Sequence, residues 1–265
     1  MAIAVFSLFR SQLFRIAKSP FFIIFGVAYV LVAAATPFAL WLYSVWPAFA
    51  ATGFVEVPSE PLSSLQLYGV SFVSGSILAM WVGIAVAELV SEDFKSGFMK
   101  NLVQARGGRV GYAASVVACC IALSAVTTAV GMMVVEGALR VQGYIPVAPT
   151  FQDAFAWFAQ VALCVSAYAS TVAALTALTK SEVVGVMGAI FIGGGAIESA
   201  FRIVLANIPG LPVFLRDCLD GYLAVDMAML GQGVLADPVT YVQAGATIAV
   251  AGVACALVMR RKNLG

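Results

Sequence analysis

The sequence predicts an all-α membrane protein with six transmembrane helices. One observation is composition: 62% of the 265 residues are hydrophobic and only 10% are charged, whereas a soluble domain carries about 25% charged residues. The other is that apolar runs recur along the chain, each near the roughly 20 residues that a helix needs to cross a bilayer. Six runs and their connections account for nearly the whole chain, so we expect one transmembrane domain over residues 1–265.

Two further elements are expected beside the spans. Residues 2–19 mix Arg10, Arg15 and Lys18 with large apolar side chains. This favours an amphipathic helix in the membrane interface, and a charged flank of the first span is the alternative. Residues 207–238 contain many Gly, Pro and Asp residues, which predicts a helical hairpin or loop before the last span. The spans themselves are expected at about 21–43, 67–89, 110–135, 155–178, 183–205 and 239–259.

The distribution of basic residues predicts the orientation, because Lys and Arg accumulate on the cytoplasmic side of membrane proteins. With the amino terminus inside, all but three of the 14 Lys and Arg residues lie in cytoplasmic segments. The exceptions are Arg140, Arg202 and Arg216. We therefore expect a multi-pass protein of the cell membrane, surrounded by lipid, with both termini in the cytoplasm.

Several kinds of chemistry find no support in the sequence. There is no histidine, and the five cysteines show no CxxC spacing, which argues against His-based triads and most zinc and haem sites. The chain has no GxxxxGK[ST] loop to cradle a nucleotide phosphate. We therefore expect no enzyme activity, no catalytic residue and no metal or cofactor on this chain, and no nucleic-acid partner.

The polar segment 91–109, after the second expected span, is the most informative part of the chain. Glu92 and Asp93 open it and basic residues close it, which suits a short helix because acids favour a helix N-terminus and bases a C-terminus. Ser91 is the expected N-cap. Apolar residues at helical spacing predict an exposed stripe, suited either to docking a soluble partner or to resting on lipid. They are Phe94, Phe98, Met99 and Leu102.

This segment resembles the region between the second and third helices of ABC-2 type transporter permeases. The resemblance covers the whole chain in architecture, and its motifs are two short stretches. One departure is Ala114 to Val116, where many relatives have a lysine, and another is Gly107-Gly108 in place of a proline. The matching residues are Glu92, Gly97, Lys100, Leu102, Ala105 to Arg109, Tyr112 and Ser115, together with Phe9 to Leu13 and Ser19 to Phe21 near the amino terminus.

The resemblance implies a drug or lantibiotic-immunity type exporter subunit in the bacterial cytoplasmic membrane. Such permeases form dimers, with a second copy or a related permease, and bind two cytosolic ABC ATPase subunits that hold ATP and Mg. It further implies that residues 92–102 form the coupling helix on the ATPase, followed by Arg109. The substrate would be a drug, an antimicrobial peptide or a lipid-like molecule.

Two features of the fifth expected span are further candidate sites. Gly185, Gly188 and Gly193 let helices approach closely, either within the chain or across a dimer face. Glu198 and Arg202 are four residues apart and are expected to form an intramembrane ion pair, or alternatively to line an exit path.

Two other classes remain as alternatives. An ATP-independent channel or secondary transporter would show ionisable residues in the middle of its spans, and five of the six expected spans lack them. An intramembrane enzyme would need a catalytic constellation, and no GxSxG motif or histidine is present.

Overall fold

A computed structural model describes residues 2–46, 62–98, 108–207 and 222–261. Every regular element in these ranges is helical, which confirms the all-α prediction. The elements are α1 (Ala2–Lys18), α2 (Pro20–Val45), α4 (Ser64–Tyr68), η1 (Gly69–Val73), η2 (Ser74–Ser76), α5 (Ile77–Lys95), α7 (Gly108–Val141), α8 (Phe151–Thr179), α9 (Glu182–Gly193), α10 (Ala196–Ala206), α12 (Leu223–Gly231) and α13 (Val239–Arg261).

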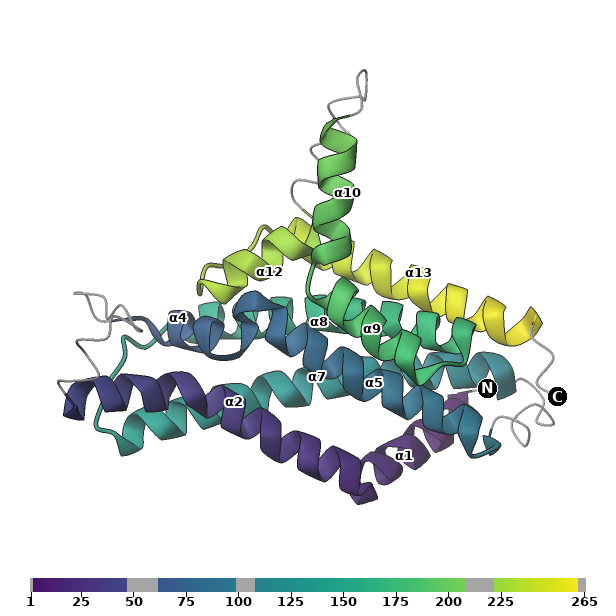
Figure 1. Ribbon diagram of the computed structural model, residues 1–265, viewed down its shortest axis with the longest axis horizontal. Helices are drawn as coiled ribbons and strands as arrows, with labels where there is room; N and C mark the ends of the chain where they lie inside the picture. The colour runs from purple at the N-terminus through teal and green to yellow at the C-terminus, as the bar shows by residue number, and fades with distance from the viewer. Residues whose placement is uncertain (1, 47–61, 99–107, 208–221, 262–265) are drawn as a thin grey trace.

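Five of the helical segments are long and apolar enough to cross a membrane: Pro20–Val45, Ser64–Lys95, Val110–Val141, Phe151–Thr179 and Val239–Arg260. They lie side by side as an elongated bundle (Figure 1). In α8, 72% of the most apolar stretch is buried, against 17% in α2. Helix α8 is therefore the centre of the bundle, and α2 lies at its edge.

The fifth expected span, 183–205, is not one helix. Helix α9 ends at Gly193, Gly195 has a φ of +71°, and α10 begins at Ala196. A residue with a side chain is rarely stable at such a φ, so the glycines allow the chain to turn sharply. Helix α10 then projects away from the bundle (Figure 1). The fifth of the six expected spans is therefore not confirmed, because the Gly193–Gly195 run divides the apolar stretch into two helices.

The second span is longer than expected and is interrupted. Between α4 and α5 the chain forms the π-helical turn η1 and the short turn η2, where Gly75 and Ser76 have positive φ values of 65° and 58°. Here α12 packs so closely that a Cβ added to Gly69 would lie 2.5 Å from the carbonyl oxygen of Gly231. The absence of a side chain at Gly69 therefore makes room for the backbone of α12.

The segment before the last span contains α12 and a loop that returns to α13. Trp157 of α8 donates its indole N–H to the carbonyl of Leu230 at 3.0 Å. The side-chain amide of Gln160 accepts from the backbone N–H of Ala236 at 3.1 Å and donates to the carbonyl of the same residue at 2.8 Å. Residues 208–221 of the predicted hairpin or loop lie outside the described residues. From residue 222 to 238 the segment is a short helix and a loop, and hydrogen bonds from central helix α8 hold both in place.

Candidate functional site

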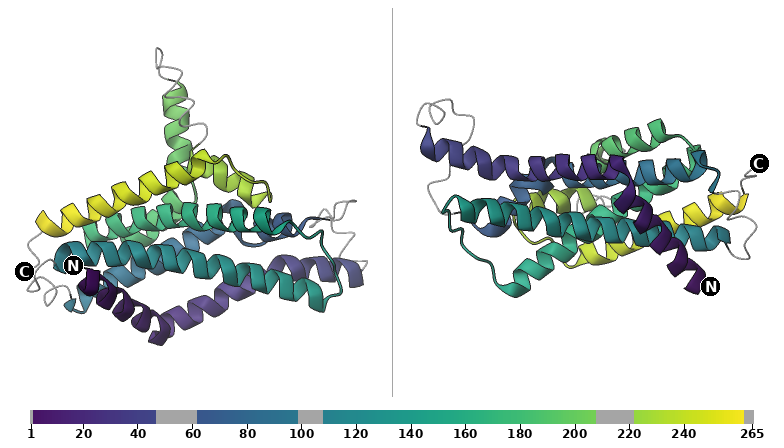
Figure 2. Two further views of the ribbon diagram at one scale, coloured as in Figure 1. Left: turned by 180° about the vertical axis from the view of Figure 1, so that it is seen from behind. Right: turned by 90° about the horizontal axis from the view of Figure 1, so that it is seen from below.

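Three elements meet at one end of the bundle: α1, the last turn of α5 and the beginning of α7. Helix α1 crosses α7 near the amino terminus (Figure 2). Between them lies Asp93, whose side chain is completely buried and forms an ion pair with Arg15 of α1. Tyr112 of α7 donates its hydroxyl to Asp93 Oδ2 at 2.8 Å. One carboxylate therefore connects three helices.

Further contacts extend this polar cluster, which we call the Asp93 cluster. Arg15 also reaches Glu92 Oε2 at 3.5 Å, and its guanidinium lies 5.8 Å from the ring centre of Phe98. Burial alone would lower the pKa of Arg15, but the hydrogen bond and the charge of Asp93 outweigh it and raise that pKa. Gln12 of α1 is buried and accepts from Cys119 of α7 at 3.1 Å. Arg15 is therefore held as a cation against the end of α5.

A second ion pair ties the same end of α5 to the connection between α8 and α9. Lys95 pairs with Glu182, the first residue of α9. The hydrogen bond from Lys95 lowers the pKa of Glu182. Ser181 caps α9 by accepting from the backbone N–H of Val184 at 3.4 Å. The last turn of α5 is thus linked to α1, α7 and α9.

The expected coupling helix does not begin at Ser91. Helix α5 continues to Lys95, and the hydroxyl of Ser91 donates to the carbonyl of Glu88 at 3.0 Å instead of capping a new helix. The chain turns only at Gly97, which has a φ of +70°. Glu92 and Asp93 therefore lie in the last turn of a long helix. The prediction of an N-cap here was wrong because the apolar pattern continues from the span into Phe94, so the helix does too.

The apolar stripe is less exposed than the sequence predicts. Phe94 and Phe98 are half-buried and pack against the hydrophobic core of the bundle. Met99, Lys100 and Leu102 lie outside the described residues, as does the side chain of Arg109. Of the aromatic residues predicted for docking, Phe98 is partly exposed, and the Arg15 guanidinium lies over its ring.

The three glycines of α9 face other helices of the same chain. A Cβ added to Gly185 would clash with Thr176 of α8 and would lie 2.9 Å from the Cβ of Ala87. A Cβ added to Gly188 would lie 2.6 Å from Leu175 Cδ2, and one added to Gly193 would lie 3.1 Å from the backbone nitrogen of Met80. All three are buried. The intrachain alternative therefore holds, and the suggested dimer face at these glycines is wrong.

Glu198 contacts groups other than the expected partner. Its Oε2 accepts from the hydroxyl of Tyr168 at 3.1 Å, and its Oε1 accepts from the backbone N–H of Ala224 at 3.0 Å. The side chain of Arg202 lies outside the described residues, so the ion pair between the two stays a prediction. Glu198 connects α10 to α8 and to the start of α12.

The sequence carries no local signal for the Asp93 cluster. Arg15 and Asp93 are 78 positions apart, and Asp93 and Tyr112 are 19 apart. The only hint was that each residue lies beside an expected span end. Within the described residues, no group of three or more His, Cys, Asp and Glu side chains is placed to hold a metal ion.

No protein-family model matches the chain, and no curated protein matches it. The class of protein therefore follows from the fold. Five long apolar helices in the described residues, with the most buried of them at the centre, are the pattern of a multi-pass membrane protein. What the molecule does within that class is a proposal that depends on the site geometry and on the resemblance described above.

Proposed function

We propose that this chain is the membrane-spanning subunit of an ATP-driven exporter of the ABC-2 type. The observation that carries the proposal is the Asp93 cluster, which joins α1, α5 and α7 directly before the segment 99–107. A force applied to that segment reaches three helices at once, because a buried ion pair connects them. That is the mechanical arrangement that a separate ATPase needs to move a transmembrane bundle.

In this proposal the two cytosolic ATPase subunits dock around Phe98 and residues 99–102, and they hold the ATP and Mg. Two charged side chains in the last turn of α5 before Phe98 are accessible: the ammonium of Lys95 and the carboxylate of Glu92, with 61% and 38% of their side chains exposed. They would form the polar rim of the docking site. Rim charges contribute little to affinity, whereas an anchored aromatic contributes most.

A second copy, or a related permease, would pack on the outward face of α9. Val183, Met187 and Phe191 recur every four residues along that helix and are 72%, 45% and 46% exposed. Residues at this spacing form one stripe of an α-helix. Both termini would be cytoplasmic, because the Asp93 cluster and the basic residues beside it lie at the end of the bundle that carries the termini.

A photo-crosslinking experiment tests the docking. A photoreactive amino acid at Lys100, in the predicted docking segment, should cross-link to a P-loop ATPase in membranes of cells that express the chain. The matched control is the same amino acid at Ile145, which is 90% exposed near the opposite end of α7. Capture of the ATPase from both positions, or from neither, would contradict the proposal.

Transport measurements separate the proposal from an ATP-independent channel or secondary transporter. In proteoliposomes, efflux should require both the ATPase and ATP, and Phe98→Ala should lower transport per ATP hydrolysed by about tenfold, as expected for loss of an aromatic anchor. Efflux at the wild-type rate without the ATPase would support the alternative class.

A further inference from the structure

Helix α1 packs on the bundle through one face only. On that face Arg15 pairs with Asp93, and Gln12 accepts a hydrogen bond from α7. Leu8 also lies against α7, because a Cβ added to Gly111 would be 3.8 Å from Leu8 Cδ1. Figure 2 shows α1 on the outside of the bundle, where its opposite face is uncovered. This opposite face is therefore a surface on which another molecule can bind.

The uncovered face of α1 is itself amphipathic, and every side chain named in this paragraph is exposed. At about 100° per residue, its apolar side chains fall in one stripe about 40° wide: Phe6, Leu13 and Ala17. A second stripe of the same width, about 120° from the first, is polar: Ser7, Ser11 and Lys18. Arg10 lies between the two stripes. The face thus changes from apolar to polar across its width, with a cation at the boundary.

The position of α1 in the chain places this face at a membrane surface. Only Ser19 separates α1 from α2, a candidate span that begins at Pro20. A helix with one apolar and one polar edge lies in the interface with its apolar edge towards the acyl chains. Phe6, which is 68% exposed, then contacts acyl chains. Arg10 lies at the level of the lipid phosphates.

The charges of α1 favour one class of lipid. The helix contains three basic residues and no Asp or Glu. One of the three, Arg15, has Asp93 as its counter-charge. Arg10 and Lys18 form no ion pair with any residue that the structure describes. The exposed face therefore offers two cations to an anionic lipid surface, which attracts basic residues close to it.

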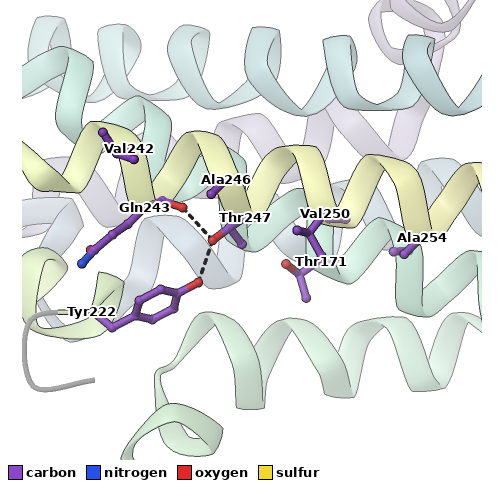
Figure 3. A pocket seen from close by; sticks show the side chains of 10 residues that line it. Thr171, Tyr222, Val242, Gln243, Ala246, Thr247, Val250 and Ala254 are labelled. Atoms are coloured by element: carbon purple, nitrogen blue, oxygen red, sulfur yellow. Dashed lines mark hydrogen bonds between the residues drawn. The ribbon is translucent and has the colours of Figure 1, made fainter. Parts of the chain in front are cut away.

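A second surface suited to acyl chains lacks such charges. A groove of about 580 Å³ lies between α8, α13 and Tyr222 (Figure 3). Val242 and Val250 on its rim are 71% and 69% exposed, so the groove opens on the side of the bundle. The described residues that line it are uncharged, and the hydroxyls of Tyr222 and Thr247 contact each other at 2.6 Å. The groove gives an anionic head group no counter-charge and so provides a control site.

We propose that the uncovered face of α1 binds an anionic phospholipid, with Arg10 and Lys18 at the head group and the apolar stripe among the acyl chains. A zwitterionic lipid has its own cation beside the phosphate and gains less from these two residues. The third basic residue, Arg15, faces the protein and holds Asp93. One short helix thus connects an anionic lipid to the Asp93 cluster.

Lipid binding is measured on the purified full-length chain in detergent, without any ATPase, so the result does not depend on the exporter role. The probes are phosphatidylglycerol and phosphatidylcholine with identical acyl chains. Native mass spectrometry should show phosphatidylglycerol bound at least tenfold more tightly, and equal affinities would overturn the proposal. Glycerol phosphate, which has no acyl chain, should not displace phosphatidylglycerol at millimolar concentration. Displacement would assign the site to a soluble anion and not to lipid.

Charge variants test the two cations. Lys18→Gln and Arg10→Gln should each weaken phosphatidylglycerol binding about fivefold and leave phosphatidylcholine binding unchanged, whereas Arg10→Lys should bind as the wild type does. The matched control is Lys180→Gln, the same change at an exposed residue between α8 and α9, and it should have no effect. An equal loss in Lys180→Gln and Lys18→Gln would mean that diffuse charge, and not α1, attracts the lipid.

Two further variants test the apolar contacts. Phe6→Ala removes an acyl-chain contact but no charge, so it should weaken the binding of both lipids to a similar degree. Ala246→Phe fills the groove beside α13 and should leave the preference for phosphatidylglycerol unchanged. Loss of that preference in Ala246→Phe, together with wild-type binding in Arg10→Gln and Lys18→Gln, would place the anionic lipid in the groove and overturn the assignment to α1.

Discussion

Asp93 and Asp226 are two buried carboxyl groups in opposite regions of the bundle, and they are stabilised in different ways. Asp93 has an ion pair with Arg15 and a hydrogen bond from Tyr112. Asp226 of α12 accepts a 2.8 Å hydrogen bond from Thr240, and burial raises its pKa. A buried charge is tolerated when a counter-charge is built in, whereas a carboxyl with only a neutral donor is driven towards its protonated form.

The two regions therefore differ in what a mutation would leave behind. In the Asp93 cluster, loss of one partner leaves a charge without compensation. In the region of α12, the attachments to α8 are neutral hydrogen bonds from Trp157 and Gln160, and loss of one leaves an unpaired dipole. The first kind of loss costs about 3–5 kcal/mol and the second about 1–3 kcal/mol.

The largest expected effect comes from removing Arg15. Arg15→Ala leaves the buried carboxylate of Asp93 with Tyr112 and no cation, and we expect the free energy of unfolding to fall by about 3 kcal/mol. Unfolding in mixed detergent micelles measures it. The double variant Arg15→Ala, Asp93→Asn should recover part of the loss, because no charge is then buried. A double variant less stable than Arg15→Ala alone would contradict the ion-pair interpretation.

A smaller effect is expected where α8 holds the loop before α13. Gln160→Leu removes both hydrogen bonds to Ala236 while keeping the side-chain volume, and should lower the free energy of unfolding by about 1–2 kcal/mol. The control is Gln142→Leu, a change of the same type at the end of α7, which should alter it by less than about 0.5 kcal/mol. If both variants lose the same amount, the loop does not depend on Gln160.

The Arg15–Asp93 ion pair and the helices around it also show where sequence reasoning succeeds and where it fails. The presence of the long helices was predictable, because the apolar runs are long. Their ends were less so: the fourth span was expected from residue 155, whereas α8 begins at Phe151 after the N-cap Thr150. The last expected span, 239–259, agrees closely with α13. The partner of Asp93 was not predictable, because Arg15 is separated from it by most of two helices and ion pairing across a bundle leaves no periodic pattern.

The errors have a common physical origin. A hydropathy pattern measures how apolar a stretch is, but it does not show whether the helix is continuous. It therefore joined α9 and α10 across Gly193–Gly195, whereas the N-cap and charge signals at Ser91 wrongly separated Glu92 from α5. In both cases backbone conformation decided the outcome, through a positive φ at Gly195 and an uninterrupted helix through Ser91.

Asp226 provides a test by pH. Its pKa is higher in the folded chain than in the unfolded chain, so its contribution to stability is complete below the unfolded pKa of about 3.9 and is lost as the pH rises through the folded pKa. The melting temperature of the wild-type chain should therefore decrease as the pH rises from the unfolded pKa of Asp226 through its folded pKa. Asp226→Asn, which keeps an acceptor for Thr240, should remove that decrease. The same decrease in both proteins would assign the pH dependence to another group.

The smallest effect is expected at Glu182, a third carboxylate, whose side chain is 39% exposed. Lys95 lowers the pKa of Glu182, so the stability contributed by Glu182 changes with pH in the opposite direction to that of Asp226. It is present above the unfolded pKa of about 4.3 and is lost as the pH falls through the folded pKa. Because water screens an exposed pair, Lys95→Gln should leave the melting temperature at pH 7 nearly unchanged and should only weaken the acid-side decrease. Glu182→Gln should have the same effect, since either change removes the pair. A large loss of stability at pH 7 in Lys95→Gln, but not in Glu182→Gln, would mean that Lys95 has a structural role apart from this pair. The last turn of α5 would then depend on Lys95 as it does on Arg15.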